Sequence, residues 1–291
     1  MAGYVGYAVR RGTRGTQEHN QHYTRSLVQY ETMTEVLMWH GDYLFLLMNL
    51  TASDFRVRYR NMSLGVLWSL LNPIILMAVL TFIFTRIIPN PKIPNYPVFI
   101  LCGLVPYNFF TISWTAGTTS ILNNGHLVKR VPFPREILPL AAVLSNLIHL
   151  LIQVGLLFTM LLAAGKTPNR YWLWLPVIWA LEVLFVTGLS LITSALNVFV
   201  RDMRYVVESV NMVLFWLVPV FYSFSVVPQA YAGVYEFNPV AALVLAMRNI
   251  LLEASAPPAM LLWKLALSST AVLAGGWLVF RNLKPSFYDH L

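Results

Sequence analysis

Long apolar stretches separated by short polar segments make up most of the chain from residue 65 onward. A helix needs about 20 predominantly apolar residues to cross the hydrocarbon core of a bilayer. Six stretches meet this requirement, and the predicted spans are Gly65–Ile87, Tyr96–Leu122, Ile137–Ala163, Tyr171–Phe199, Val206–Val226 and Leu261–Phe280. We therefore expect an all-α integral membrane protein with six transmembrane helices.

A shorter apolar piece, Pro239–Leu252, lies between the fifth and sixth predicted spans. It is too short to cross a bilayer. Non-helical backbone at membrane depth is tolerated only where it is buried in protein or lines a water-filled cavity. We expect this piece to belong to a pair of short re-entrant or interfacial helices at the outer face.

A different pattern precedes the first span. Polar positions spaced by four, three and four residues form one stripe of a helix, and they are Asn49, Ser53, Arg56 and Arg60. Apolar positions cover the opposite side, namely Leu44, Leu47, Leu50, Thr51 and Phe55. Asp54 and Arg58 are four residues apart and can pair within that side. This pattern predicts an amphipathic helix at the lipid–water interface.

The predicted organisation has four parts. Residues 1–30 form a flexible cytoplasmic tail, 31–64 the interfacial helix region, 65–284 the six-helix membrane domain and 285–291 a cytoplasmic C-terminal tail. Asp42 is placed to cap the interfacial helix at its amino end.

Composition agrees with a membrane protein. The chain is 57% hydrophobic and 11% charged, with a mean hydropathy of +0.62, whereas soluble domains carry roughly a quarter charged residues. The net charge of +8 would suit nucleic acid, but the basic residues lie at the ends of apolar segments. There they orient the chain and meet anionic lipid headgroups, so no nucleic-acid partner is expected. The single Cys102 excludes an intrachain disulfide, and no metal site is expected.

Charge bias also orients the spans. Of the 20 Lys and Arg residues, fourteen fall on the side of the amino terminus and six on the opposite side. Cytoplasmic segments carry this excess. We expect both termini in the cytoplasm.

With this orientation, the loop His126–Pro139 (HLVKRVPFPREILP) is cytoplasmic. Pro132 and Pro134 restrict the backbone around Phe133, and charged residues surround it. Such a knuckle could fill a groove on a partner protein, or it could be an ordinary basic loop that follows the charge bias. The residues alone favour neither interpretation.

Three segments resemble a known family. The run DFRVRYRNMSLGVLWSLLNP (Asp54–Pro73) is similar to the membrane subunits of type-2 ABC exporters, in particular those that export lipid-linked O-antigen and teichoic-acid chains. HLVKRVPFPREILPL and FNPVAALVLAMRNILL show weaker similarity, and the layout agrees from about Thr34 to Lys284. The resemblance implies a permease of the bacterial cytoplasmic (inner) membrane. It also implies a coupling loop that contacts an ATPase, with Lys129, Arg130, Val131, Phe133, Arg135 and Glu136.

The chain offers no nucleotide site of its own. Gly165-Lys166-Thr167 is similar to the end of a phosphate-binding loop, but the required first glycine falls at Met160 and the preceding segment is a predicted span. ATP and Mg²⁺ are therefore expected on a separate cytoplasmic ATPase subunit, with no cofactor and no catalytic residue on this chain. The implied assembly is a homodimer with two ATPase copies.

Aromatic residues are dense in the spans. Sugar rings present apolar C–H faces that stack on aromatic faces without a fixed sequence, as bases do in single-strand channels. The alternative is the aromatic belt that anchors spans at the interface. The candidates for lining a glycan channel are Phe109, Phe110, Trp114, Phe215, Trp216, Phe221 and Tyr222.

Charged groups add two predictions. A lipid-linked glycan carries a diphosphate, and Arg suits phosphate oxygens best; Arg56, Arg58 and Arg60 are the candidates, with membrane anchoring as the alternative. Glu182 and His149 are ionisable groups within spans. For both, hydrogen bonding between helices is favoured over a proton relay.

The sequence leaves other functions open. An exporter of a small lipid or drug would share the layout. A polytopic membrane enzyme acting on polyprenyl-linked sugars would show clustered carboxylates, whereas the 12 acidic residues here are scattered. A passive channel would need no coupling loop.

Overall fold

The computed structural model describes residues 42–60, 65–87, 93–228, 233, 235 and 238–290, and the regular structure in these residues is helical. The predicted all-α membrane fold is confirmed. The 1–30 tail and residues 61–64 of the predicted bend lie outside the described residues. In chain order the helices are α2 (Tyr43–Tyr59), η1 (Gly65–Leu67), α3 (Trp68–Phe82), η2 (Ile83–Ile87), α4 (Tyr96–Asn123), α5 (Gly125–Arg130), α6 (Ile137–Ser145), α7 (Leu147–Ala163), η3 (Arg170–Trp174), α8 (Leu175–Phe199), α9 (Met203–Leu217), η4 (Phe224–Val226), α11 (Pro239–Leu251), α12 (Ala259–Leu283) and η5 (Lys284–Asp289).

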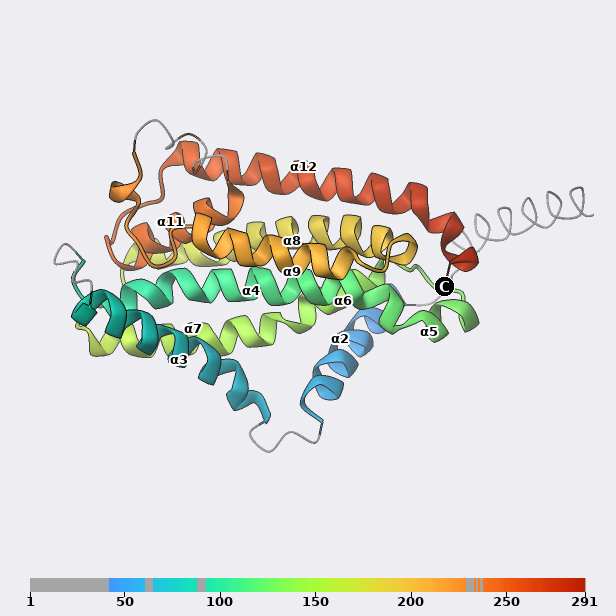
Figure 1. Cartoon of the computed structure of the whole chain (residues 1–291), viewed down its shortest axis with the longest axis horizontal. Helices are drawn as coiled ribbons and strands as arrows, with labels where there is room; N and C mark the ends of the chain where they lie inside the picture. Colours follow the sequence, from blue (N-terminus) through green and yellow to red (C-terminus); the bar gives the residue numbers. More distant parts are fainter. Residues whose placement is uncertain are drawn as a thin grey trace, which may run out of the picture.

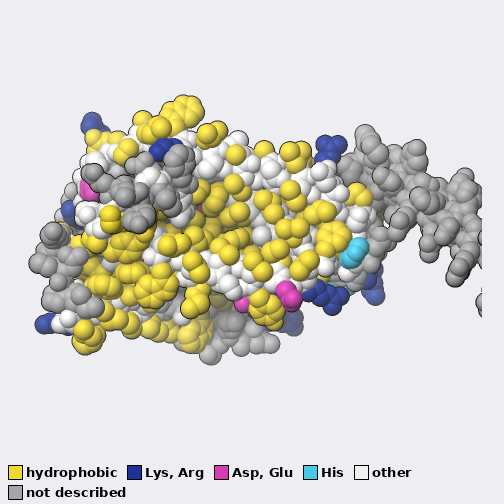
Figure 2. Space-filling model, turned by 45° about the horizontal axis from the view of Figure 1, so that its top comes forward, with side chains coloured by type: hydrophobic (Ala, Val, Ile, Leu, Met, Phe, Trp, Pro, Cys, Tyr) yellow, Lys and Arg dark blue, Asp and Glu magenta, His cyan; other side chains and the backbone are white. Residues whose placement is uncertain are grey.

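The long helices run side by side along the long axis of the molecule, with α4 in the centre (Figure 1). α4 packs against α3, α6, α7, α8, α9 and α11, and most of its side chains are buried. In contrast, α3 and α12 expose large apolar side chains such as Phe82, Trp263 and Leu267. Figure 2 shows hydrophobic side chains over the visible face and Lys and Arg near the two ends. This distribution suits a chain surrounded by lipid.

Two glycines allow α8 and α12 to pack closely. A Cβ at Gly188 would lie 2.6 Å from the backbone nitrogen of Leu273, and a Cβ at Gly276 would lie 2.3 Å from the carbonyl oxygen of Gly188. Small residues at such crossings let membrane helices approach backbone to backbone.

Five helical segments are long and apolar enough to span a membrane among the described residues, and they are Trp68–Ile87, Tyr96–Asn123, Ile137–Ala163, Arg170–Phe199 and Ala259–Phe287. The predicted fifth span, Val206–Val226, is different. Its helix α9 has 15 residues, which is about 22 Å and shorter than the roughly 30 Å hydrocarbon core. It ends at Leu217 because Pro219 lacks an N–H and forces the preceding Val218 into the extended region.

Helix α11 is too short to span, as predicted, and nearly all of it is buried against α4, α8 and α12. The Asn238 side chain caps its amino end, and Pro239 follows at the first helical position. The buried Arg248 donates to the carbonyl oxygens of Val220 (2.6 Å) and Tyr222 (3.2 Å). These bonds hold the extended segment after α9 against α11. The remainder of the predicted short helix pair falls largely outside the described residues.

Candidate functional site

A polar stripe follows the carboxyl-terminal half of α4. Thr111, Thr115, Thr119 and Asn123 repeat every four residues and so lie on one face of the helix. This face forms the floor of a hollow of about 560 Å³. The hollow, with the smaller one beside it described below, is called the polar groove; its other lining residues are Arg58, Ile112, Ala116, Arg204, Glu208 and Asn211. Hydroxyl, amide and charged groups therefore line a surface within the helical bundle.

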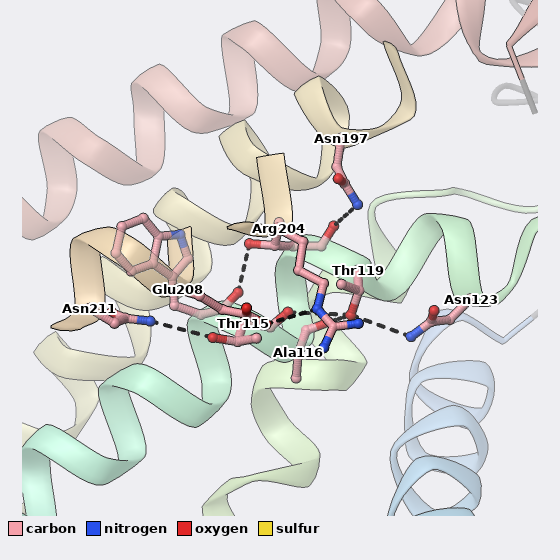
Figure 3. A network of polar contacts seen from close by, with 10 residues as sticks. Thr115, Ala116, Thr119, Asn123, Asn197, Arg204, Glu208 and Asn211 are labelled. Carbon is pink, nitrogen blue, oxygen red and sulfur yellow. Dashed lines mark hydrogen bonds and ion pairs between the residues drawn. The ribbon is translucent and has the colours of Figure 1, made fainter. Parts of the chain in front are cut away.

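Helix α9 supplies one wall of the polar groove. Asn211 is almost buried and donates from its amide to the Thr115 hydroxyl at 3.4 Å (Figure 3). Arg204 and Glu208, one turn apart, form an ion pair of 2.8 Å at the rim, with side chains 57% and 42% exposed. On α4, Asn123 donates to Thr119 at 3.3 Å. The wall from α9 and the floor from α4 thus both present polar groups that a ligand in the groove can reach.

Helix α2 supplies the opposite wall. A neighbouring hollow of about 330 Å³ lies between α2, α4 and α6, and both hollows are lined by Arg58, Ala116, Thr119 and Asn123. The Arg58 guanidinium donates to the Asn146 side-chain oxygen at 2.5 Å, which joins α2 to the break between α6 and α7. Burial lowers the pKa of Arg58, and the nearby Asp54 carboxylate opposes this shift. Burial also raises the pKa of Asp54, against the opposing effects of Arg58 and Ser145.

Comparison with known proteins shows to which family the chain belongs. The sequence model of the family described as ABC-2 type transporter matches residues 46–252, which include α2, α4 and α9. The chain belongs to the ABC-2 type transporter family. It is thus a multi-pass membrane protein of a transporter family, a permease subunit and not an enzyme.

Curated relatives carry names that refer to glycan export. The O-antigen export system permease protein RfbA of Klebsiella pneumoniae is 34% identical over 223 residues, covering 76% of this chain and 86% of the relative. RfbA of Myxococcus xanthus is 30% identical over 252 residues, covering 86% and 96%. The polysialic acid transport protein KpsM of Escherichia coli is 23% identical over 234 residues, covering 79% and 90%.

In this ABC-2 protein the three candidate arginines of α2 are separated. Arg58 lines the polar groove, whereas Arg56 and Arg60 are exposed on the other side of the helix. Leu44, near the amino end of α2, is 63% exposed, although it lies on the face that the sequence predicts to be apolar. Helix α2 packs on α6 through the predicted apolar side, on which the half-buried Leu50, Asp54 and Arg58 lie. Capping by Asp42, which accepts from the Phe45 N–H at 3.1 Å, agrees with the sequence.

The seven aromatic candidates are also divided. Phe109, Phe110, Trp114 and Phe221 are at most 8% exposed and belong to the main core. Phe110 stacks on Phe185 of α8, with ring centres 6.0 Å apart. These four side chains therefore pack within the chain and do not line the polar groove. The others lie at or just beyond the carboxyl end of α9: Phe215 and Tyr222 are half-buried and Trp216 is 61% exposed.

The predicted coupling loop forms α5 and the turn before α6. Its exposed residues are Lys129, Arg130 and Val131. Phe133 does not protrude, because it packs against a cluster that includes Phe287 of the C-terminal segment. The buried Arg135 donates to the Lys284 carbonyl oxygen at 2.9 Å, and Glu136 pairs with the Lys284 ammonium at 3.0 Å. The C-terminal segment thus supports the base of this loop.

The two ionisable groups within spans differ. His149 lies 2.8 Å from the Tyr59 hydroxyl of α2, so its predicted hydrogen bond between helices is confirmed. Glu182 is fully buried, and among the described residues neither of its oxygens has a hydrogen-bond partner. Within the same described part of the chain, no group of His, Cys, Asp and Glu could hold a metal ion.

Sequence reasoning missed the α4 stripe and the polar residues of α9. The four-residue repeat from Thr111 to Asn123 is visible in the sequence. The repeat is less conspicuous than the many aromatic residues of the same span, which suggest a stacking path. A polar side chain repeated along one face of a membrane helix is itself a functional signal.

Proposed function

We propose that this chain is the membrane subunit of an ATP-driven exporter that moves a polyprenyl-diphosphate-linked polysaccharide, of O-antigen or teichoic-acid type, across the cytoplasmic (inner) membrane. The observation that carries the proposal is the polar groove inside a transmembrane bundle. The names of the relatives, which refer to export of O-antigen and polysialic acid, support the same substrate class.

The groove has the chemistry that a glycan needs. Threonine hydroxyls and asparagine amides both donate and accept hydrogen bonds, as sugar hydroxyls do. Because Thr111, Thr115 and Thr119 repeat along α4, a sugar chain can exchange one partner for the next as it slides. Arg58 and Arg204 lie at the inner end of the groove and are suited to the diphosphate.

The proposed assembly is a homodimer with two cytoplasmic ATPase subunits. Helix α9 borders the groove and exposes Met212, Val213 and Trp216 on its outward side. A second copy that covers this apolar surface would close the groove into a path. The exposed Lys129, Arg130 and Val131 are the part of the coupling loop that an ATPase can reach. ATP and Mg²⁺ would bind to that partner.

The proposal keeps six crossings and cytoplasmic termini. α9 covers most of the bilayer, and the extended residues that follow Leu217 complete the crossing, supported by Arg248. Irregular backbone is acceptable at that depth because it is buried in protein. Attaching reporters to either end of α9 would test this topology.

The deciding experiment replaces hydroxyls on the floor of the groove. In the double variant Thr115→Leu/Thr119→Leu, we expect surface polysaccharide to fall by about tenfold or more, because sugar hydroxyls lose their partners. Protein level and ATPase co-purification should remain normal. Thr159→Leu is the control, since Thr159 is exposed on α7 outside the groove.

Normal export by a well-folded double variant would overturn the proposed path. Substrate-stimulated ATPase activity in lipid nanodiscs then separates the alternatives. Stimulation by small amphiphiles, and not by polyprenyl-diphosphate glycan, would assign the chain to the export of a small lipid or drug.

A further inference from the structure

A third hollow lies between α6, α8 and α12 and shares no lining residue with the polar groove. It has a volume of about 630 Å³. We call it the apolar groove; its apolar walls include Leu140, Val183, Leu184, Leu273, Trp277 and Leu278. Tyr43 and Glu136 line its cytoplasmic end. The hollow is therefore amphipathic, with one polar end and a surface that is otherwise apolar except for Thr187.

The depth of the apolar groove corresponds to one membrane leaflet. On α8 it extends from Val183 to Leu191, which is about 12 Å at 1.5 Å per residue. One leaflet of hydrocarbon is about 15 Å, half of the roughly 30 Å core. The groove thus reaches from the cytoplasmic interface towards the bilayer midplane.

The groove opens towards lipid. On α12, Trp277 is 46% and Leu278 is 58% exposed, and much of this span is not covered by the rest of the chain. A ligand can therefore enter sideways from the bilayer, with its apolar part remaining in hydrocarbon throughout. A linear amphiphile fits this geometry better than a soluble molecule does.

Glu136 is the charged residue that lines the polar end, and its partner Lys284 lies just outside the lining. The Lys284 ammonium lies 3.0 Å from a Glu136 carboxylate oxygen, and the two side chains are 18% and 14% exposed. The Arg135 guanidinium holds the Lys284 backbone in place. A carboxylate can accept about four hydrogen bonds and an ammonium has three donors, so this pair leaves capacity on both sides. A zwitterionic headgroup complements it.

We propose that the apolar groove binds one acyl chain of a phosphatidylethanolamine molecule of the cytoplasmic leaflet, with the headgroup at Glu136 and Lys284. The primary ammonium of ethanolamine can donate to Glu136 while the phosphate accepts from Lys284. Choline has no N–H to donate. A polyprenyl diphosphate is disfavoured because its headgroup is entirely anionic and would meet the Glu136 carboxylate, whereas Arg58 and Arg204 lie in the polar groove.

Native mass spectrometry tests this site without an export assay, so its result is independent of the proposed transport function, although the choice of leaflet rests on the proposed orientation. The chain, with its ATPase if that co-purifies, is released from nanodiscs containing equal amounts of phosphatidylethanolamine and phosphatidylcholine. We expect the ethanolamine lipid to be retained about tenfold over the choline lipid, as one charge-assisted hydrogen bond implies.

Three variants locate the binding. Ala274→Trp places a large side chain in the groove and should abolish retention, whereas Ala271→Trp, one turn away on α12 and outside the groove, should retain the lipid. Glu136→Gln should remove the preference for ethanolamine over choline. Size-exclusion profiles and melting temperatures check that each variant is folded.

Equal retention of the two lipids by the unmodified chain would overturn the proposal. Unchanged retention in a folded Ala274→Trp variant would do the same. Displacement of the bound lipid by one equivalent of polyprenyl diphosphate would assign the groove to a substrate tail and would also contradict it.

Discussion

The polar groove and the apolar groove are built from the same bundle but have opposite surfaces. Threonine, asparagine and arginine line the first, whereas the second is apolar except at Thr187 and at the end that Tyr43 and Glu136 line. An apolar hollow costs little in a bilayer, because lipid tails can fill it. Polar side chains at membrane depth are expensive, and a polar occupant would give the threonine row hydrogen-bond partners in addition to the backbone carbonyls to which Thr111 and Thr119 donate. This contrast supports the two proposals, which place the cargo in the polar groove and a lipid tail in the apolar one.

The two grooves are also held open differently. Backbone-to-backbone packing at Gly188 and Gly276 fixes the walls of the apolar groove. Side-chain contacts fix the walls of the polar groove, with Arg58 bonded to Asn146 and Asn211 bonded to Thr115. Substitutions that break one set of contacts should leave the other intact.

Gly188→Leu should have the largest effect. Its side chain would collide with the backbone of α12, where even a Cβ lies 2.6 Å from Leu273. Overpacking in a core typically costs about 1–3 kcal/mol, and backbone offers no room to relax. We expect loss of folded protein in detergent, measured by size-exclusion chromatography and thermal unfolding. Gly275→Ala is the control, because nothing lies within 4 Å of a Cβ there. Equal behaviour of the two variants would show that the helices do not pack this closely.

Arg58→Ala should have the next largest effect, on the polar groove. It removes the donor to Asn146 and the charge beside Asp54, and leaving such groups unpaired costs about 1–3 kcal/mol. We expect a lower melting temperature together with reduced export. Arg56→Ala, on the exposed side of the same helix, should change neither quantity substantially. A similar loss in both variants would mean that the arginines act only as membrane anchors.

Asp54 provides a smaller, pH-dependent effect. Burial raises its pKa above the ordinary value of 3.8. The folded chain then keeps a proton that the unfolded chain releases, so stability should fall as the pH rises from the ordinary value through the raised one. Asp54→Asn should remove this slope in melting temperature above about pH 4. Asp42→Asn, at the exposed cap of α2, should retain it, and a slope that persists in Asp54→Asn would assign it to another group.

The spans could be predicted because length and apolarity are properties of a local window. The span Ile137–Ala163 has the same bounds in the sequence prediction and in the structure. The predicted end of α9 is wrong because hydropathy averaged over a window ignores a single proline, although Pro219 is present in the sequence. Local rules of this kind can be recovered from sequence.

The partners of each side chain could not be predicted in the same way. Phe110 and Trp114 looked like channel residues, but α8 covers them and Phe185 lies beside them. Phe133 looked exposed, but it packs in a cluster with Phe287, far along the chain. These contacts join residues distant in sequence, and no periodicity within one segment reports them.

The Arg204–Glu208 pair should show the smallest effect on stability. Both side chains are largely exposed, and exposed ion pairs contribute little because water screens them. We expect Glu208→Gln to leave the melting temperature unchanged. The pair nevertheless lines the polar groove, so the variant should still alter export, which surface polysaccharide measures. A changed melting temperature with normal export would make the pair a structural contact. Reduced export with an unchanged melting temperature would extend the functional surface of the polar groove from α4 to α9.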